Sequence, residues 1–431
     1  MKFTHAIFAL FFLLILSCGT PKSESTQERE TYELAISDSI RIDYIGTLNL
    51  MDVNPGFEKI LFFDPQNMKF VSTDFKGKIL GEFSKERDAP DGFGFYPMAA
   101  GRFNSSQNIQ VVSMLGTYEY DLAGNLLSSK KIPRDEAKPF SGRADAKREI
   151  QFVGDKILLS GSIARGEYNK TQPEFYDTYL QLVWADPKTG SFEQFLSLDS
   201  ASIFQNNMSH EPSTLSASFE VVENKLYVIS GIDPFLNIYE LDSPYTKLKR
   251  VALELTDYRL NTGEDPKKAD PRAISYDPSF GIIQKLVKVG DKLVIMYETG
   301  YSDQDAIRSR ENMSQSEWQE FYTRMKDTYK MRYQILDLEG KLLSDAVIPE
   351  ELGDLFVSRE GSLWFMGKVN AEIEEDFYTL YQVELKYKKL DQRPSFFYSF
   401  INLNLIYLAL RSFLSYFSPG NFLLWRNCIS A

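Results

Sequence analysis

Side chains that commonly carry catalysis are scarce in this sequence. Histidine occurs twice, as His5 near the start of the chain and as His210 in a polar segment. Cysteine also occurs twice, as Cys18 and Cys428. Ser-His-Asp triads need a histidine as base, and a histidine zinc site needs several. The sequence therefore excludes both, and it predicts neither a metal nor a cofactor. For His210 two interpretations remain, a loop residue or part of a central binding site.

Carboxylates and arginines are the remaining candidates for a ligand site. Paired carboxylates can cleave a glycosidic bond or hold Ca²⁺, whereas arginines bind anionic groups. No spacing typical of a calcium loop occurs. We therefore assign no catalytic residue and expect a ligand site where the loops between repeats converge. Its candidate side chains are Asp88, Asp91, Arg143, Asp145, Arg148, Glu149, Arg165, His210 and Glu211.

The first 33 residues carry targeting signals. Lys2 precedes an apolar run that is too short to span a bilayer comfortably, which is typical of a signal peptide over residues 1–17. The run ends in Leu16-Ser17-Cys18-Gly19, which resembles a lipobox, so Cys18 is the predicted site of lipid attachment. Two or more acyl chains give stable anchoring. The polar residues 18–33 are expected to form a flexible tether.

The composition limits the partners of the protein. The chain has a net charge of −12, with 60 acidic and 48 basic residues, and 43% of its residues are hydrophobic. Binding of nucleic acid depends on clustered Lys and Arg, so a nucleic-acid partner is excluded. The predicted partners are the membrane, through Cys18, and a protein or glycan of the cell envelope. The expected location is the cell envelope, at the outer membrane.

Two hairpin motifs recur along the chain. The first, Asp337-Leu-Glu-Gly-Lys-Leu-Leu343, has copies at residues 121–127 and 74–80, each flanked by apolar runs. The second, Val289-Gly-Asp-Lys-Leu-Val294, has copies at residues 153–158 and 222–227. Pairs such as Gly-Asp and Glu-Asn tolerate the positive φ that tight hairpins require. Two alternating hairpins give four antiparallel strands per repeat, the unit of a β-propeller.

The spacing of these motifs predicts an all-β fold, a six-bladed β-propeller over residues 34–392. A β-sandwich with accidental turn similarity is the alternative. The strand around Ile40–Thr47 is left over, and we expect it to close the ring by joining the first or last blade. The expected blades cover residues 56–84, 100–132, 148–198, 216–255, 281–348 and 352–390.

One loop carries a resemblance to a known family. Residues 85–97 contain Arg87-Asp-Ala-Pro-Asp-Gly92 after the first hairpin. A loop of this kind resembles that of secreted six-bladed, TolB-like propeller lipoproteins of Gram-negative bacteria. An uncharacterised branch, known only as a domain of unknown function, has a similar Glu-Gly-Pro-Asn-Gly-like loop. The resemblance implies a TolB-like propeller over about residues 30–390 and no established activity.

Two insertions interrupt the repeats. Residues 257–280 are rich in Asp, Pro, Lys and Gly, which predicts a surface loop. Residues 303–330 predict one amphipathic helix, because Ser314 and Glu317 form a capping box before a spaced aromatic series. Its aromatic face either packs on the rim of the propeller or docks a partner as a lid. The residues on this face are Trp318, Phe321, Tyr322, Met325 and Tyr329.

The C-terminal segment, residues 393–431, does not follow the repeat. It is hydrophobic and lacks acidic residues from Ser395 onward, although Arg411 within it is costly in lipid. Three interpretations remain for this segment: a membrane-associated tail, a shift of reading frame that replaces the native terminus, and a transmembrane helix.

Together these patterns favour a binding or protein-interaction module over an enzyme. The alternative is a carboxylate-based hydrolase or lyase that acts on an envelope or extracellular glycan at the mouth of the propeller. The two differ in a simple way: an enzyme needs acidic or arginine side chains that converge in a walled pocket.

Overall fold

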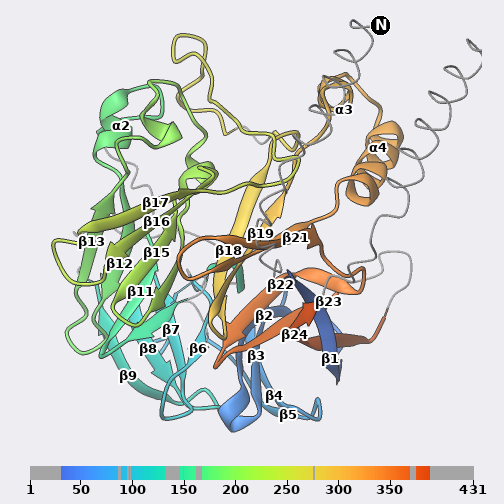
Figure 1. The fold of residues 1–431 in the computed structure, drawn as a ribbon. Helices are drawn as coiled ribbons and strands as arrows, with labels where there is room; N and C mark the ends of the chain where they lie inside the picture. Colours follow the sequence, from blue (N-terminus) through green and yellow to red (C-terminus); the bar gives the residue numbers. More distant parts are fainter. Residues whose placement is uncertain are drawn as a thin grey trace, which may run out of the picture. The chain divides into compact units, whose positions relative to one another are not determined.

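The computed structural model describes residues 31–85, 89–94, 97, 99–132, 146–148, 150–161, 167–274, 277–368 and 375–388. Within them, 24 strands form six sheets of four strands each. Neighbouring strands in each sheet run antiparallel, and the sheets are arranged as the blades of a propeller (Figure 1). The predicted six-bladed β-propeller is confirmed, and the β-sandwich is excluded.

The strands follow the chain with one exception. The first blade contains β2 (Asn49–Asn54), β3 (Lys59–Asp64), β4 (Lys69–Asp74) and β5 (Ile79–Ser84). The second contains β6 (Arg102–Phe103), β7 (Ile109–Ser113), β8 (Gly116–Tyr120) and β9 (Leu126–Lys131). The third contains β10 (Gln151–Val153), β11 (Lys156–Ser160), β12 (Leu180–Ala185) and β13 (Phe192–Ser197). The fourth contains β14 (Ser218–Val222), β15 (Lys225–Ile229), β16 (Phe235–Glu240) and β17 (Lys247–Ala252). The fifth contains β18 (Ile282–Val289), β19 (Lys292–Glu298), β20 (Arg332–Asp337) and β21 (Leu342–Val347).

The sixth blade joins the two ends of the propeller. Its strand order is β22 (Leu352–Arg359), β23 (Ser362–Gly367), β24 (Phe377–Lys388) and then β1 (Thr31–Asp43). The leftover N-terminal strand thus completes the last blade, one of the two positions expected for it. Because β1 begins at Thr31, the last three residues of the expected tether belong to a strand instead. This register places Leu34, Ile40 and Ile42 in the interior.

The recurring turns have the geometry that their sequences require. In the Asp337 turn, the carboxylate accepts hydrogen bonds from the N–H groups of Glu339 (2.9 Å) and Lys341 (2.8 Å). Gly340 has φ of 82°, a left-handed conformation that favours glycine. The second motif also has positive φ where expected, at 54° for Glu223 and 60° for Gly290. The residues of each motif therefore match the turn geometry that its hairpin needs.

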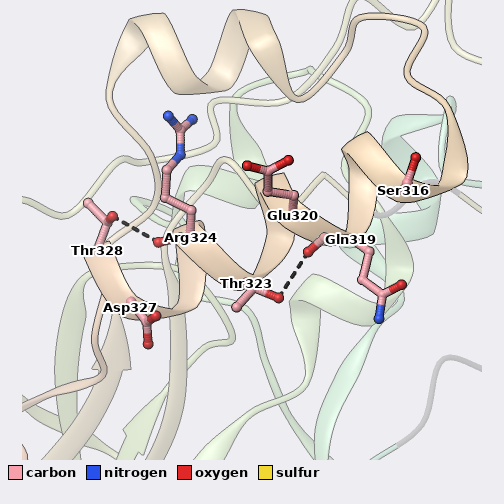
Figure 2. Close-up of a pocket in the computed structure, with 7 residues that line it drawn as sticks. All are labelled: Ser316, Gln319, Glu320, Thr323, Arg324, Asp327 and Thr328. Carbon is pink, nitrogen blue, oxygen red and sulfur yellow. Dashed lines mark hydrogen bonds between the residues drawn. The ribbon is translucent and has the colours of Figure 1, made fainter.

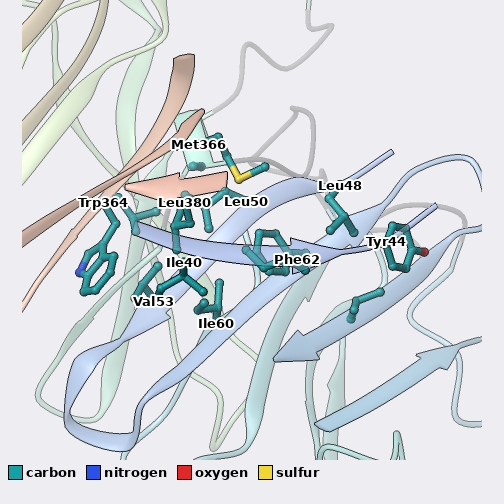
Figure 3. Close-up of a cluster of buried hydrophobic side chains, with 14 residues drawn as sticks. Ile40, Tyr44, Leu48, Leu50, Val53, Ile60, Phe62, Trp364, Met366 and Leu380 are labelled. Carbon is teal, nitrogen blue, oxygen red and sulfur yellow. The ribbon is translucent and has the colours of Figure 1, made fainter. Parts of the chain in front are cut away.

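Hydrophobic clusters between neighbouring blades form the core. The cluster between the last and first blades draws on β1, β2, β3, β23 and β24, so it seals the ring (Figure 3). Its central side chains, including Ile42, Phe62 and Leu380, are fully buried. Burial of this kind contributes about 1.5–3 kcal/mol per large side chain.

Short helices occur in the insertions. In the described residues they are α3 (Asp303–Arg308) and α4 (Gln315–Thr328), so the insertion at 303–330 holds two helices rather than one. A further short helix, α2 (Pro173–Asp177), lies in the connection between β11 and β12. The predicted capping box is present, since Ser314 Oγ accepts from Glu317 N and the Glu317 carboxylate accepts from Ser314 N. Among the described residues, no helix has the length and apolarity to cross a membrane.

Candidate functional site

The two faces of the propeller differ in the length of their loops. The antiparallel meander of each blade places its first hairpin turn on one face, and blades one to five also have their third hairpin turn there. All other connections lie on the opposite face. The first group consists of turns of a few residues. The second includes residues 161–179 with α2, residues 253–281, and residues 299–331 with α3 and α4. The three helices therefore share the long-loop face, as Figure 1 shows.

A short helical turn, η2 (Ala146–Arg148), lies against the innermost strands. Ala146 is fully buried in the cluster that seals the ring. The ammonium group of Lys285, a residue only 2% exposed, donates to the carbonyl oxygens of Ala146 (2.7 Å) and Phe356 (3.1 Å). A buried ammonium is stable only when its protons are hydrogen-bonded. Lys285 therefore ties η2 into the centre of the ring, between blades five and six.

Charged and polar side chains gather where η2 reaches the long-loop face. Lys147 Nζ pairs with Asp354 Oδ2 at 2.6 Å, and Gln284 Nε2 donates to Glu298 Oε1 at 2.6 Å. Burial raises the pKa of the Glu298 carboxyl, and the negative charge of Asp354 raises it further. The positive charge of Lys147 and the hydrogen bond from Gln284 lower the pKa and offset part of this rise. We name Lys147, Gln284, Glu298 and Asp354 the mouth cluster.

Of the predicted mouth residues, Arg148 lies beside this cluster, as part of η2. Its Nη1 donates to Ser216 Oγ at 2.9 Å, which joins η2 to the connection before the fourth blade. Five other predicted ligand residues and the lipidation site lie outside the described residues, so their assignments stay predictions. They are Asp88, Arg143, Asp145, Glu149, Arg165 and Cys18.

Asp91 is held within the loop between the first two blades. Its carboxylate pairs with Lys85, and this hydrogen bond is the main reason why the pKa of Asp91 lies below its usual range. The Asp91 carbonyl oxygen accepts from Tyr120 OH at 2.7 Å. These contacts tie Asp91 to Lys85, which follows the first blade, and to Tyr120 of the second blade.

His210 and Glu211 form a separate, buried group between blades three and four. Glu211 Oε2 pairs with Lys170 Nζ at 2.9 Å, and both side chains are less than 10% exposed. His210 is 2% exposed and packs edge-on against the rings of Phe204 and Tyr176. Burial lowers the pKa of His210 to about 4. These side chains fix the long loops of blades three and four in place.

The aromatic series on α4 is divided between two environments. Phe321 and Met325 are buried, and the ring of Phe321 lies edge-on to Tyr301. Trp318 is 52% exposed, and its ring stacks on the partly exposed Tyr322. The buried stripe of α4 is narrower than the aromatic face predicted from the sequence. Phe321 and Met325 therefore pack on the propeller, whereas Trp318 does not.

Two hollows open beside the inserted helices. One of about 600 Å³ follows the outer side of α4, and Figure 2 shows that its described lining comes from this one helix. It is lined by Ser316, Gln319, Glu320, Thr323, Arg324, Asp327 and Thr328. The other, of about 570 Å³, lies between the end of α4 and the end of β19, with Asp257, Tyr301, Lys330 and Arg332 in its wall. The described residues contain no group of three or more His, Cys, Asp or Glu side chains arranged to hold a metal ion.

Sequence reasoning did not identify the mouth cluster. Its members come from η2, β18, β19 and β22, which are more than 200 residues apart in the chain at the extremes. One pattern in the sequence could have indicated it: Gln284 and Asp354 are each the third residue of the innermost strand of their blade. Residues at this place in each repeat face the ring's axis at the long-loop face.

Comparisons with known proteins support the fold. No family model matches the sequence, and no curated protein matches it. A member of the DUF4221 family from Bacteroides vulgatus is similar, with a TM-score of 0.56 and 12% identity over 84% of this chain and 100% of that chain. An exported protein from Bacteroides fragilis has a TM-score of 0.45 and 11% identity, over 84% of this chain and 97% of its own. BamB from Moraxella catarrhalis has a TM-score of 0.35 and 12% identity, over 81% of this chain and 100% of its own.

At these identities the likeness concerns the fold alone. The expected resemblance to an uncharacterised branch of propellers is confirmed in that sense. The chain is a six-bladed β-propeller that shares its architecture with the DUF4221 protein, and its ligand chemistry has to be inferred from its own residues.

Proposed function

We propose that this protein is a lipoprotein of the cell envelope whose propeller is a binding module. The observation that carries the proposal is the difference between the two faces. Among the described residues, the long loops and the helices α2, α3 and α4 lie on one face, whereas the other face has short turns. In repeat folds, insertions on one face commonly mark the binding face. The partner is an envelope protein or a glycan, and the acidic chain of net charge −12 disfavours nucleic acid.

The proposed anchor is Cys18, at the outer membrane, with the propeller held away from the lipid by the polar residues that follow. The sequence Leu16-Ser17-Cys18-Gly19 supports this part. A Cys18→Ser variant is expected to lose incorporation of labelled fatty acid and to leave the membrane fraction. Retention of the label in this variant would overturn the anchor and leave the binding face untouched.

Site-specific photocrosslinking in intact envelopes tests the binding face. A photoreactive amino acid at Lys267 or Ile307 samples the long-loop face, and the same group at Asp155 or Lys341 samples the short-turn face. All four positions are exposed, so the pairs are matched. We expect discrete crosslinked species only from the first pair. Equal crosslinking from both pairs, or none from Lys267 and Ile307, would contradict a binding module with this face.

A carboxylate-based hydrolase or lyase acting on a glycan is the second candidate, and the mouth cluster favours it. A general acid needs a raised pKa, and burial raises that of Glu298 while Asp354 stands near it. In this case purified protein would cleave envelope glycans. Glu298→Gln would abolish the cleavage, and Asp354→Asn would reduce it strongly. Glycan that remains intact in the presence of the wild-type protein would exclude the enzyme.

A further inference from the structure

An exposed ladder of three side chains runs along one flank of α4. The rings of Trp318 and Tyr322 are stacked, with centroids 5.0 Å apart and planes 10° from parallel. Lys326 continues the series, with its Nζ 4.9 Å from the centre of the Tyr322 ring. Positions four apart lie on one side of a helix, so the three form a continuous stripe. The outer ring, Trp318, is half-exposed at 52%.

The ladder is rigid before any ligand arrives. The capping box at Ser314 and Glu317 fixes the start of α4, and burial of Phe321 and Met325 fixes the neighbouring flank. The stack in turn limits the rotamers of Trp318 and Tyr322. A flat surface that is ordered in advance lowers the entropic cost of binding.

Polar groups lie directly beside the aromatic surface. Gln319 and Thr323 each follow a ladder residue by one position, so they occupy the adjacent stripe, 100° around the helix. Both line the hollow of about 600 Å³ on α4, together with the carboxylate of Asp327 (Figure 2). An aromatic plane bordered by amide, hydroxyl and carboxylate groups suits a ligand with an apolar ring face and many hydroxyl groups.

The charges near the ladder balance one another. Lys326 lies close enough to Glu298 for its positive charge to lower the pKa of that carboxyl, and the charges of Lys147 and Asp354 also act there. Lys147 and Asp354 form an ion pair. With Lys326 counted beside the mouth cluster, two cations (Lys326 and Lys147) stand near two carboxylates (Glu298 and Asp354). This balance favours a neutral partner over an ionic one.

The exposed apolar area is small. A stable protein interface buries about 800 Å² on each partner around an apolar core, whereas α4 exposes one large indole with polar side chains around it. One indole matches the face of one sugar ring. Building on the proposed function, we infer that this face binds a neutral glycan chain. One sugar ring stacks on Trp318, and its hydroxyl groups bond to the side chains that line the hollow.

Calorimetric titration of the full-length acylated protein in detergent tests this inference. The probes are three neutral oligosaccharides, chitohexaose, cellohexaose and maltohexaose. We expect saturable binding of at least one, weakened about tenfold or more by Trp318→Ala, a factor that corresponds to about 1.4 kcal/mol. Trp318→Phe keeps an aromatic plane and should retain most of the affinity. Leu127→Ala, at an equally exposed apolar residue of β9 (52%), is the matched control and should bind normally.

Two results would overturn the glycan site: no saturable binding of any of the three probes, or equal affinity in wild type and Trp318→Ala. If glycan binding fails while photocrosslinking from Lys267 or Ile307 captures a protein, the binding module stands and its partner is a protein. If neither experiment gives a signal, the proposed function falls together with the glycan.

Discussion

Asp52 and Arg359 form an ion pair that is buried between the first and last blades. Their side chains are 3% and 13% exposed, and Arg102 Nε lies 3.7 Å from the same carboxylate. The Asp52 carboxylate also accepts from the N–H of Phe103 at 2.9 Å. Burial is the main reason why the pKa of Arg359 lies below its usual range, so Arg359 depends on this partner.

Replacing Asp52 with Asn should therefore destabilise the propeller strongly, because two buried arginines would lose their counter-charge. The expected loss in the free energy of unfolding is about 3–5 kcal/mol, measured by urea denaturation. Lys188→Ala removes an exposed ion pair with Asp155 and serves as the control, with no measurable change expected. An Asp52→Asn variant as stable as the wild type would show that the pair contributes nothing to closing the ring.

The stability of the protein between pH 4 and 6.5 should depend on His210. The folded state holds the pKa of His210 at about 4, below the ordinary 6.5, because the ring is buried. The unfolded chain therefore takes up the proton first. The stability that comes from the neutral ring is complete above pH 6.5 and is lost as the pH falls towards 4, by roughly 3 kcal/mol in all.

The measurement is the difference in unfolding free energy between wild type and His210→Gln at several pH values. That difference should shrink from pH 7 to pH 4, since only the wild type loses this contribution. Raised pKa values of Asp233 and Glu298 act in the opposite direction in both proteins and cancel in the comparison. A constant difference across the range would show that His210 does not titrate in this way.

At the residue scale, sequence predicted which side chains were available but not their partners. Asp52 and Arg359 are 307 positions apart, and no local pattern relates them. Because Asp91, His210 and Glu211 lie in loops between blades, the sequence predicts that they share one ligand site. In the structure each instead contacts side chains of its own pair of blades, since buried polar groups are hydrogen-bonded to their neighbours.

Among the elements, α4 is the one whose stability is most separable from the ring. Phe321 and Met325 are buried, yet neither belongs to any of the hydrophobic clusters between blades. Elements with few contacts to the main core open independently of global unfolding. The inserted helix therefore behaves as a local unit placed on a stable frame.

Replacing both Phe321 and Met325 with Ala should release α4 while the ring stays folded. Each truncation removes about 2–5 kcal/mol from the packing of the helix. Hydrogen exchange should become fast across residues 315–328, and the urea midpoint of the remaining sheets should stay unchanged. Gln319→Ala, at an exposed position on the same helix, is the control and should alter neither. Loss of the global midpoint in the double variant would show that α4 is part of the cooperative core.

The pattern of the inserted segment was predictable in part. Capping and helical periodicity are local, so the start of α4 and its buried residues Phe321 and Met325 followed from sequence. The exposure of Trp318 did not, because the width of the buried stripe depends on how closely the propeller approaches the helix. The break between α3 and α4 also escaped notice, since residues 309–314 carry no proline or glycine to mark it.

For the whole molecule, the repeated turns were sufficient to predict six blades. Hairpin geometry is set by a few residues, and its recurrence reports the architecture directly. The mouth cluster could not be predicted in this way, because the repeated turns do not indicate which side chains of different blades meet at the axis. Ring closure lies between these cases: a leftover strand implied it, and the structure assigns that strand to the last blade.

Strand β1 should be replaceable in trans, because it is continuous with no other strand of its own blade. It supplies Ile40 and Ile42 to the cluster that seals the ring. It also reaches the fifth blade, where Leu34 N donates to Tyr333 OH at 3.3 Å and Tyr32 N donates to Ser344 Oγ at 2.6 Å. A chain that begins at residue 44 should therefore lose cooperative unfolding, since the sixth blade then ends in an unpaired edge.

Addition of a synthetic peptide of residues 31–43 should restore a cooperative transition whose midpoint rises with peptide concentration, as binding to the folded state alone requires. A peptide with Ile40→Ser and Ile42→Ser is the matched control. It can form the same backbone hydrogen bonds but cannot fill the seam, so it should restore nothing. Equal rescue by both peptides would mean that edge pairing closes the ring without the buried seam. Cooperative unfolding of the truncated chain on its own would mean that closure does not depend on β1.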